Sequence, residues 1–103
     1  MKLLIAGYGS IGRRHLNNLI ALGEKDKGLE WARRSRKIDP DDPMLLYNLG
    51  CFHSLAGELE EAIDCLERAV AGGLLQRGWY ENDGDLDPLR GHPRFKALLE
   101  KLP

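Results

Sequence analysis

The stretch PDDPMLLYNLGCFHSLAGELEEAIDCLERAV, residues 40–70, decides the fold that we expect for this sequence. Two apolar helical patterns follow one another in it, and a single glycine, Gly57, separates them. Pro40 ends the helix before the stretch, and Pro43 suits the first position of the next helix, because a proline there forfeits no helical hydrogen bond. The stretch therefore predicts two helices joined by a tight turn.

The same pattern stands 34 residues earlier in the chain. At this offset Gly23 aligns with Gly57, and Ser35 aligns with Ala69. A fixed period of about 20–50 residues indicates a repeat architecture, in which neighbouring units bury one another's apolar faces. We therefore expect two pairs of helices, at residues 10–22 with 25–38 and 43–56 with 59–70.

Residues 40–70 resemble a tetratricopeptide repeat, a helix–turn–helix unit of about 34 residues. The similarity extends over residues 10–73. The sequence departs from the family pattern at His53, where an aromatic residue is usual, and at Leu74, where a proline is usual. The residues that match the packing positions of the family are Leu46, Leu49, Gly50, Ala62, Leu66 and Ala69.

Residues 74–103 resemble the C-terminal caps that follow tetratricopeptide pairs and cover the last exposed helix face. Asp87 and Pro88 suit the cap and the first position of a short helical turn, and Pro93 suits the start of a final helix. The aromatic residues that we expect to pack in this cap are Trp79 and Tyr80. The expected fold is thus all-α. It has a short extended or frayed N-terminus at residues 1–9, two repeats at residues 10–42 and 43–73, and a cap at residues 74–103.

The first 23 residues carry a second signature. GYGSIGRRHLNNL, residues 7–19, contains a G-x-G-x-x-G motif after a short apolar run. The segment resembles the opening of the NAD(P)-binding Rossmann domain of the glucose-fructose oxidoreductase and inositol dehydrogenase family. The resemblance implies that the phosphates of NAD or NADP would lie against the motif at a helix N-terminus. The residues that it assigns to the cofactor are Gly7, Gly9, Ser10 and Gly12.

The sequence after Gly23 lacks the strands that such a domain needs. EKDKGLEWARRSRK, residues 24–37, is typical of a charged helix, and no later segment predicts a parallel strand. Because a lone strand leaves its backbone groups unpaired, we expect no cofactor, and the residues from Ser10 onward form the first helix of the repeats. Two alternatives stay open: an NAD(P)-binding fragment of an oxidoreductase completed by another chain, and a fusion or engineered chain without an evolved function.

The tetratricopeptide resemblance implies a non-enzymatic module that binds a peptide or a partner segment. Such repeats bind on a concave face formed by the first helix of each pair. One sub-family holds a terminal carboxylate there with a basic residue and two asparagines, whose positions are taken here by Arg13, Asn17 and Asn48, although its further basic residues have no counterpart. Guanidinium and amide groups can donate hydrogen bonds to such a carboxylate. The candidate peptide-binding residues are Arg13, Asn17, Tyr47, Asn48 and Cys51.

Charge is unevenly distributed along the chain. Eight basic residues lie between Arg13 and Lys37, whereas residues 39–67 hold eight acidic residues and no lysine or arginine. We expect both runs to form solvated helix faces next to helix ends of opposite partial charge. The runs are Arg33, Arg34, Arg36 and Lys37, and Glu58, Glu60, Glu61, Asp64 and Glu67.

The composition argues against several other classes of protein. The formal net charge is -1, so we expect no general attraction to nucleic acid. No apolar run reaches membrane-spanning length, and we expect a cytoplasmic protein. Cys51 and Cys65 form no C-x-x-C motif, and the histidines lie in separate elements, which predicts buried, reduced thiols and neither a metal site nor a catalytic group. The apolar residues 3–5 suggest pairing with a second copy of the chain.

Overall fold

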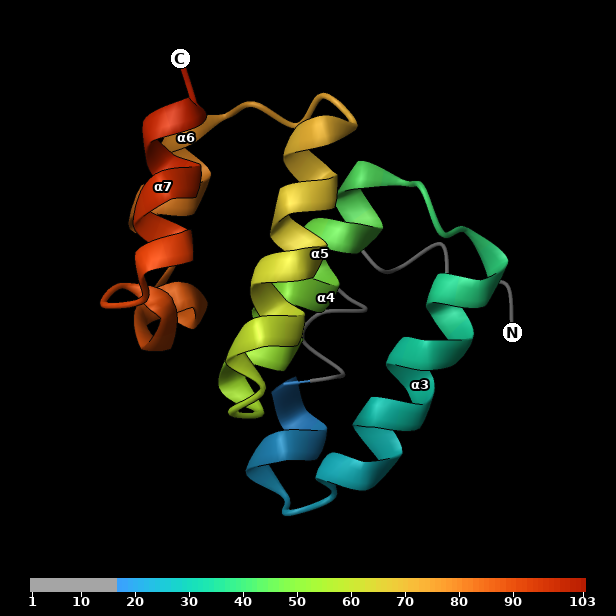
Figure 1. Cartoon of the computed structure of the whole chain (residues 1–103). Helices are drawn as coiled ribbons and strands as arrows, with labels where there is room; N and C mark the ends of the chain where they lie inside the picture. The colour runs from blue at the N-terminus through green and yellow to red at the C-terminus, as the bar shows by residue number, and fades with distance from the viewer. Residues whose placement is uncertain (1–16) are drawn as a thin grey trace.

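The computed structural model describes residues 17–103, and this part of the chain is built of helices joined by short turns, without a strand (Figure 1). The prediction of an all-helical fold with paired helices is therefore confirmed for these residues. After a helical turn at residues 17–21, the elements are α3 (Lys25–Ile38), α4 (Pro43–Leu55), α5 (Leu59–Ala71), α6 (Arg77–Asn82), the 3-10 helix η1 (Gly84–Leu89) and α7 (Pro93–Lys101).

Three helices lie where the sequence pattern predicts them, to within one residue at each end. The start of α4 shows the reason. The carboxylate of Asp42 accepts a hydrogen bond from the backbone N–H of Met44 at 3.0 Å, and Pro43 occupies the first helical position. A side-chain acceptor and a proline are both favourable at a helix N-terminus, because the first N–H groups have no partner within the helix.

The 34-residue period is visible in the backbone. Gly23 and Gly57 both have positive φ angles, 79° and 85°. The residue after each glycine donates its N–H to the carbonyl oxygen five residues earlier. Glu24 donates to Leu19 at 2.8 Å, and Glu58 donates to His53 at 2.9 Å. Glycine suits this turn because a side chain is strained at such φ angles. The two turns are therefore equivalent, as the sequence repeat predicts.

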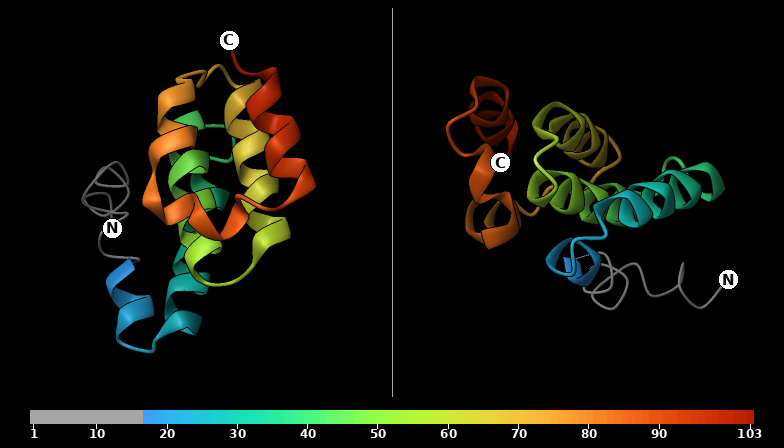
Figure 2. Two further views of the ribbon diagram at one scale, coloured as in Figure 1. Left: turned by 90° about the vertical axis from the view of Figure 1, so that its left-hand side faces the viewer. Right: turned by 90° about the horizontal axis from the view of Figure 1, so that it is seen from below.

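The closest helix pair is α4 and α5. A methyl group added at Gly50 would lie 2.7 Å from Cδ2 of Leu66 and 3.2 Å from the carbonyl oxygen of Ala62. The absence of a side chain at Gly50 thus lets the two helix backbones approach each other. Every residue of α4 from Leu45 to Ser54 is buried, because α5, α3 and the C-terminal elements all lie around it (Figure 2).

The C-terminal elements form a cap that departs from the prediction in three respects. Tyr80 is fully buried as expected, whereas Trp79 keeps 43% of its surface exposed. Asp83, not Asp87, caps η1 by accepting a hydrogen bond from the N–H of Asp85 at 3.0 Å, and Pro88 lies inside η1 instead of opening a helix. The sequence analysis also missed α6, since its six residues are too few to show a helical period.

Arg90 holds the cap together. Its guanidinium donates to the backbone oxygens of Tyr80 at 3.0 Å and Asp83 at 2.9 Å, and it lies 5.7 Å from the ring centroid of Phe95. One side chain therefore connects α6, η1 and α7. The final helix begins at Pro93 as predicted, with His92 accepting from the N–H of Arg94 at 3.2 Å.

The predicted non-helical segment, residues 1–9, and the predicted helix start at Ser10 lie outside the described residues. So do the apolar residues 3–5 to which pairing with a second copy was assigned. Within the part that the structure describes, no helix combines the length and the apolar character that crossing a membrane requires.

Candidate functional site

The candidate peptide-binding residues of α4 are covered by the chain itself. Tyr47, Asn48 and Cys51 keep only 2%, 3% and 0% of their surfaces exposed. The ring of Tyr47 meets the ring of Tyr80 edge to face at 5.2 Å, and its hydroxyl donates to the carboxylate of Asp83 at 2.9 Å. This conformation therefore offers no open peptide surface at these three residues, because α6 and η1 lie on it.

The carboxylates next to these residues come from the chain's own cap. The amide of Asn17 donates to Asp85 Oδ2 at 2.9 Å, and the hydroxyl of Ser54 donates to the backbone oxygen of Asp85 at 2.7 Å. The structure thus places one of the two predicted carboxylate-binding asparagines on an internal aspartate. Arg13, the basic residue of that set, lies outside the described residues.

Cys51, Asp83 and Asp85 each offer a ligand atom, and these atoms lie within 4.8 Å of one another. Cys51 Sγ contacts Asp83 Oδ2 at 3.7 Å, which is hydrogen-bond distance for sulfur. The hydrogen bonds that join the two aspartates to α4 account for this cluster structurally, and we assign no metal to it. The cofactor residues of the alternative, Gly7, Gly9, Ser10 and Gly12, lie outside the described residues, and residues 17–103 supply no strand for a dinucleotide-binding sheet.

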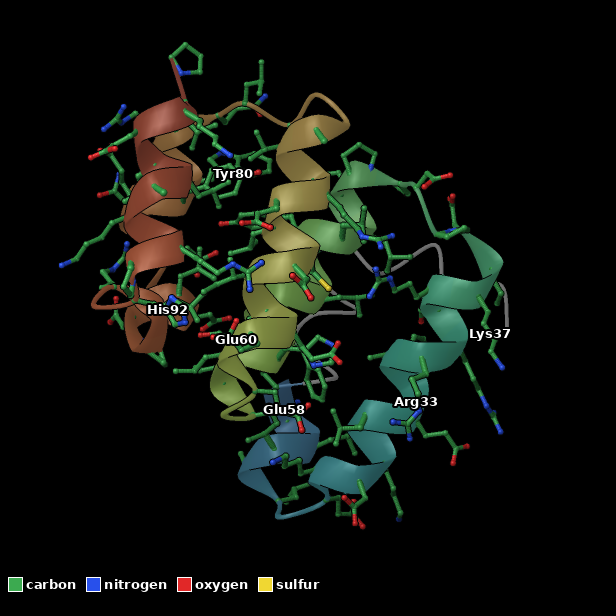
Figure 3. The ribbon with its side chains drawn as sticks, in the orientation of Figure 1. Arg33, Lys37, Glu58, Glu60, Tyr80 and His92 are labelled. Atoms are coloured by element: carbon green, nitrogen blue, oxygen red, sulfur yellow. The ribbon has the colours of Figure 1, made fainter. Side chains whose placement is uncertain are left out.

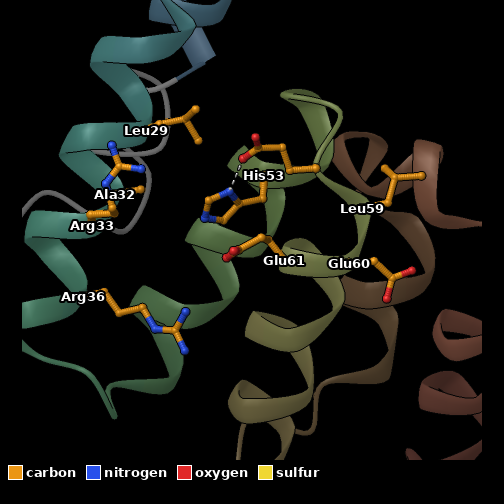
Figure 4. A pocket seen from close by; sticks show the side chains of 9 residues that line it. Leu29, Ala32, Arg33, Arg36, His53, Leu59, Glu60 and Glu61 are labelled. Atoms are coloured by element: carbon orange, nitrogen blue, oxygen red, sulfur yellow. Dashed lines mark hydrogen bonds and ion pairs between the residues drawn. The ribbon is translucent and has the colours of Figure 1, made fainter.

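A different place on the molecule has the shape of a binding site. A cavity of about 400 Å³ lies between α3 and the start of α5 (Figure 4). Leu29, Ala32 and Leu59 provide its apolar lining, and His53 of α4 reaches into it between the two helices. Its volume falls at the lower end of the range for ligand pockets, about 300–1,000 Å³.

Two arginines of α3 line one side of this cavity. Arg33 and Arg36 stand three residues apart and therefore share one helix face. Neither forms an ion pair with a carboxylate of the described residues, and Arg36 donates to Cys65 Sγ, a weak acceptor, at 3.9 Å. Arg34, on another face of α3, pairs with Glu30 at 2.9 Å. Arg33 is exposed, as expected of a solvated basic face, whereas Arg36 is partly buried, which corrects the expectation for Arg36.

Glutamates line the opposite side, at the first turn of α5. Glu58 lies 3.3 Å from Nδ1 of His53, and Glu61 forms no ion pair with a described residue. Glu60 also borders the cavity, but its carboxylate lies 2.6 Å from both Arg94 and His92 on the side of α7 (Figure 3). Two glutamates of the cavity, Glu58 and Glu61, therefore form no ion pair with a lysine or arginine among residues 17–103, and they face two arginines that form no ion pair with a carboxylate there.

The remaining acidic residues of α5 lie on a largely exposed face, as the sequence predicts, but they are paired with a cation of α7. Arg94 of α7 donates to Asp64 at 2.6 Å and to Glu67 at 2.8 Å, besides its bond to Glu60. Two hydrogen bonds, the larger contribution coming from His92 and the smaller from Arg94, hold the pKa of Glu60 below its usual range. These charges attach α7 to α5 and are not available to a partner.

Burial shifts the pKa of two titratable groups beside the cavity. Burial lowers the pKa of His53, and the hydrogen bond to Glu58 opposes this shift only in part, so the imidazole is neutral at pH 7. Burial raises the pKa of the Cys65 thiol to about 11, so the reactive thiolate is scarce near neutral pH. Both cysteines are buried and form no disulfide, as predicted. Near neutral pH the Cys65 thiol is therefore not an activated nucleophile, and the charged side chains of the cavity are suited to binding charged groups.

Comparison with known proteins adds no family to this description: no protein-family model matches the chain, and no solved structure matches it significantly.

The sequence analysis did not single out the cavity. A signal was present, since Arg33 and Arg36 on one predicted helix, and Glu58 and Glu61 at the start of another, both show the three-residue spacing of a shared face. What the spacing did not show is that the two pairs face each other.

Proposed function

We propose that the chain is a non-enzymatic interaction module of the tetratricopeptide type that binds a segment of a partner protein. Two helix pairs with equivalent glycine turns support the repeat, and the close approach at Gly50 suits the packing of such a unit. The binding surface in this proposal differs from the one that the resemblance implies, because the cap covers Tyr47, Asn48 and Cys51 on α4.

The observation that carries the proposal is the cavity between α3 and α5. It combines an apolar lining, at Leu29, Ala32 and Leu59, with charged groups that the described part of the chain leaves without ion-pair partners. Binding sites in proteins commonly have this composition, since apolar contacts supply affinity and a few polar groups fix orientation. A segment of a few residues matches the volume of about 400 Å³ better than a folded surface does.

Amide chemical shifts of the ¹⁵N-labelled chain would test the proposal during titration with a panel of acetylated, amidated hexapeptides. We expect saturable shifts at Leu29, Ala32 and Leu59 with part of the panel. Arg33→Trp should block them by filling the cavity from an exposed position, whereas Arg34→Trp, on another face of α3, should not. Shifts confined to α6 and η1, or no saturable shift with any peptide, would overturn the proposal. Saturable NADH binding that Gly9→Ala abolishes would favour the nucleotide-binding alternative instead.

A further inference from the structure

We infer that the bound segment carries both an acidic and a basic side chain: the acidic one binds Arg33 and Arg36, and the basic one binds Glu58 and Glu61. The inference rests on the proposed function, because it names the chemistry of the segment that the same cavity would take. Its basis is the juxtaposition of two like-charged pairs on opposite sides of one cavity.

The arginine side suits a carboxylate. Arg36 is partly buried, and it donates a hydrogen bond to the sulfur of Cys65 at 3.9 Å. A guanidinium that is withdrawn from water while it faces only a weak acceptor gains from a carboxylate, to which it can donate two parallel hydrogen bonds. Arg33 lies one helical turn away on the same face and adds a second positive charge. Together they define the acidic end of the ligand.

The glutamate side suits a cation. Glu58 contacts only the neutral imidazole of His53 within the described chain, and its carboxylate keeps further lone pairs for a second donor. Glu61 lies on the next turn of α5 and is exposed. The negative charge of Glu61 acts to raise the pKa of His53 and the positive charge of Arg36 acts to lower it, which places the two charges around the same ring.

A ligand with charge of a single sign fits this cavity poorly. A simple anion attracted by Arg33 and Arg36 would also meet Glu58 and Glu61, and a simple cation would meet the arginines. A segment that carries one charge of each sign satisfies both sides and places its apolar part on Leu29 and Leu59. Discrimination against wrongly charged segments follows from the same repulsion.

Four acetylated, amidated peptides with a common leucine-rich middle would test the inference: one with a glutamate and a lysine, one with the lysine alone, one with the glutamate alone, and one with neither. Dissociation constants come from the same amide-shift titration. We expect the doubly charged peptide to bind most tightly. Arg33→Gln with Arg36→Gln should weaken it roughly tenfold, whereas the lysine-only peptide should bind more tightly, because the repulsion from the two arginines is removed. Glu58→Gln with Glu61→Gln should likewise weaken the doubly charged peptide, and in this variant the glutamate-only peptide should bind more tightly.

Control variants separate this effect from net charge. Arg34→Gln and Glu100→Gln each remove one charge, of the same sign as in the matching test variant, from exposed positions that do not line the cavity, and should change no dissociation constant by more than about twofold. Equal binding of all four peptides would overturn the inference and leave the proposed function standing. Absence of binding by every peptide would overturn both. Coupled stability losses in Arg36→Gln and Glu61→Gln without peptide would mean that the two charges pair with each other, which also overturns the inference.

Discussion

The hydroxyl of Tyr47 in α4 lies 2.9 Å from Oδ2 of Asp83 at the start of η1, and this hydrogen bond is one of those that tie the cap to the helix pair. The carbonyl oxygen of Trp79 lies 3.1 Å from the same hydroxyl. Because the ring of Tyr47 is buried against Tyr80, the hydrogen bond is partly shielded from water. The hydroxyl oxygen of Tyr47 should therefore contribute to the stability of the cap.

Tyr47→Phe removes that oxygen and keeps the ring. We expect a loss of about 1–2 kcal/mol in the free energy of unfolding, the usual effect of deleting one partner of a shielded hydrogen bond. Urea denaturation followed by circular dichroism measures it. Amide hydrogen exchange should rise first in α6 and η1, and an unchanged exchange pattern there would contradict the role assigned to Tyr47.

Gly50→Ala tests the close approach of α4 and α5. The added methyl would lie 2.7 Å from Cδ2 of Leu66, so the helices must separate, and we expect a loss of about 1–3 kcal/mol. Gly78→Ala is the matched control, because its methyl would meet only Asn82 at 3.8 Å. Since alanine has a higher helix propensity than glycine, the control should be neutral or stabilising in the same denaturation experiment. Equal losses in both variants would contradict the packing described above.

Ser35→Ala should stabilise the protein. The side-chain oxygen of Ser35 is buried in α3 and has no hydrogen-bond partner among the described residues. The residue 34 positions later is Ala69, which is fully buried. Removing an unsatisfied hydroxyl and gaining helix propensity should add roughly 0.5–1 kcal/mol to the free energy of unfolding. A destabilised variant would mean that the hydroxyl has a partner in solution.

Arg94→Gln should lower the melting temperature, because Arg94 connects α7 to three carboxylates of α5. These groups are exposed, so salt should screen their attraction. We expect a larger decrease at about 0.01 M than at about 0.5 M salt, where the screening length is several-fold shorter. Arg34→Gln, which removes one pairing within α3, should show a smaller decrease. Salt-independent decreases would point to lost packing instead of lost charge.

The buried His53 predicts a pH effect on stability. Burial lowers its pKa in the folded chain below the ordinary value of 6.5, so the unfolded chain binds this proton at higher pH than the folded chain does. The stability that depends on a neutral His53 is present above pH 6.5 and is lost as the pH falls through the folded pKa. His53→Gln should flatten the fall in melting temperature between about pH 7 and pH 5. An unchanged pH profile would assign that fall to other groups.

The helix boundaries could be predicted because local chemistry determines them. Asp42 and Pro43 open α4, and Gly57 turns the chain before α5, whatever surrounds them. α6 could not be predicted in the same way. It contains Gly78, a poor helix former, and its stability comes from Tyr80, which is buried against residues far away in the sequence.

The candidate site was predicted less well than the fold, for a similar reason. Periodicity shows that Tyr47 and Cys51 share a face of α4, but it does not show which element covers that face. Here the cap covers it, through contacts between residues more than 30 positions apart in the sequence. The charges of Arg36 and Glu61 could likewise be expected on helix surfaces, whereas their common cavity depends on how α3 lies against α5.

The cap has a consequence for how this architecture can grow. In an open-ended stack of helix pairs, each unit presents a face on which the next one nucleates. Here α6 and η1 occupy that face of α4, and Arg90 holds their backbone in place. In the repeat architecture that we propose, a further helix pair would therefore have to be inserted before Leu74, so that the cap stays on the outermost pair. The tail would then set the length of the stack, because it covers the face of α4 on which a following pair would pack.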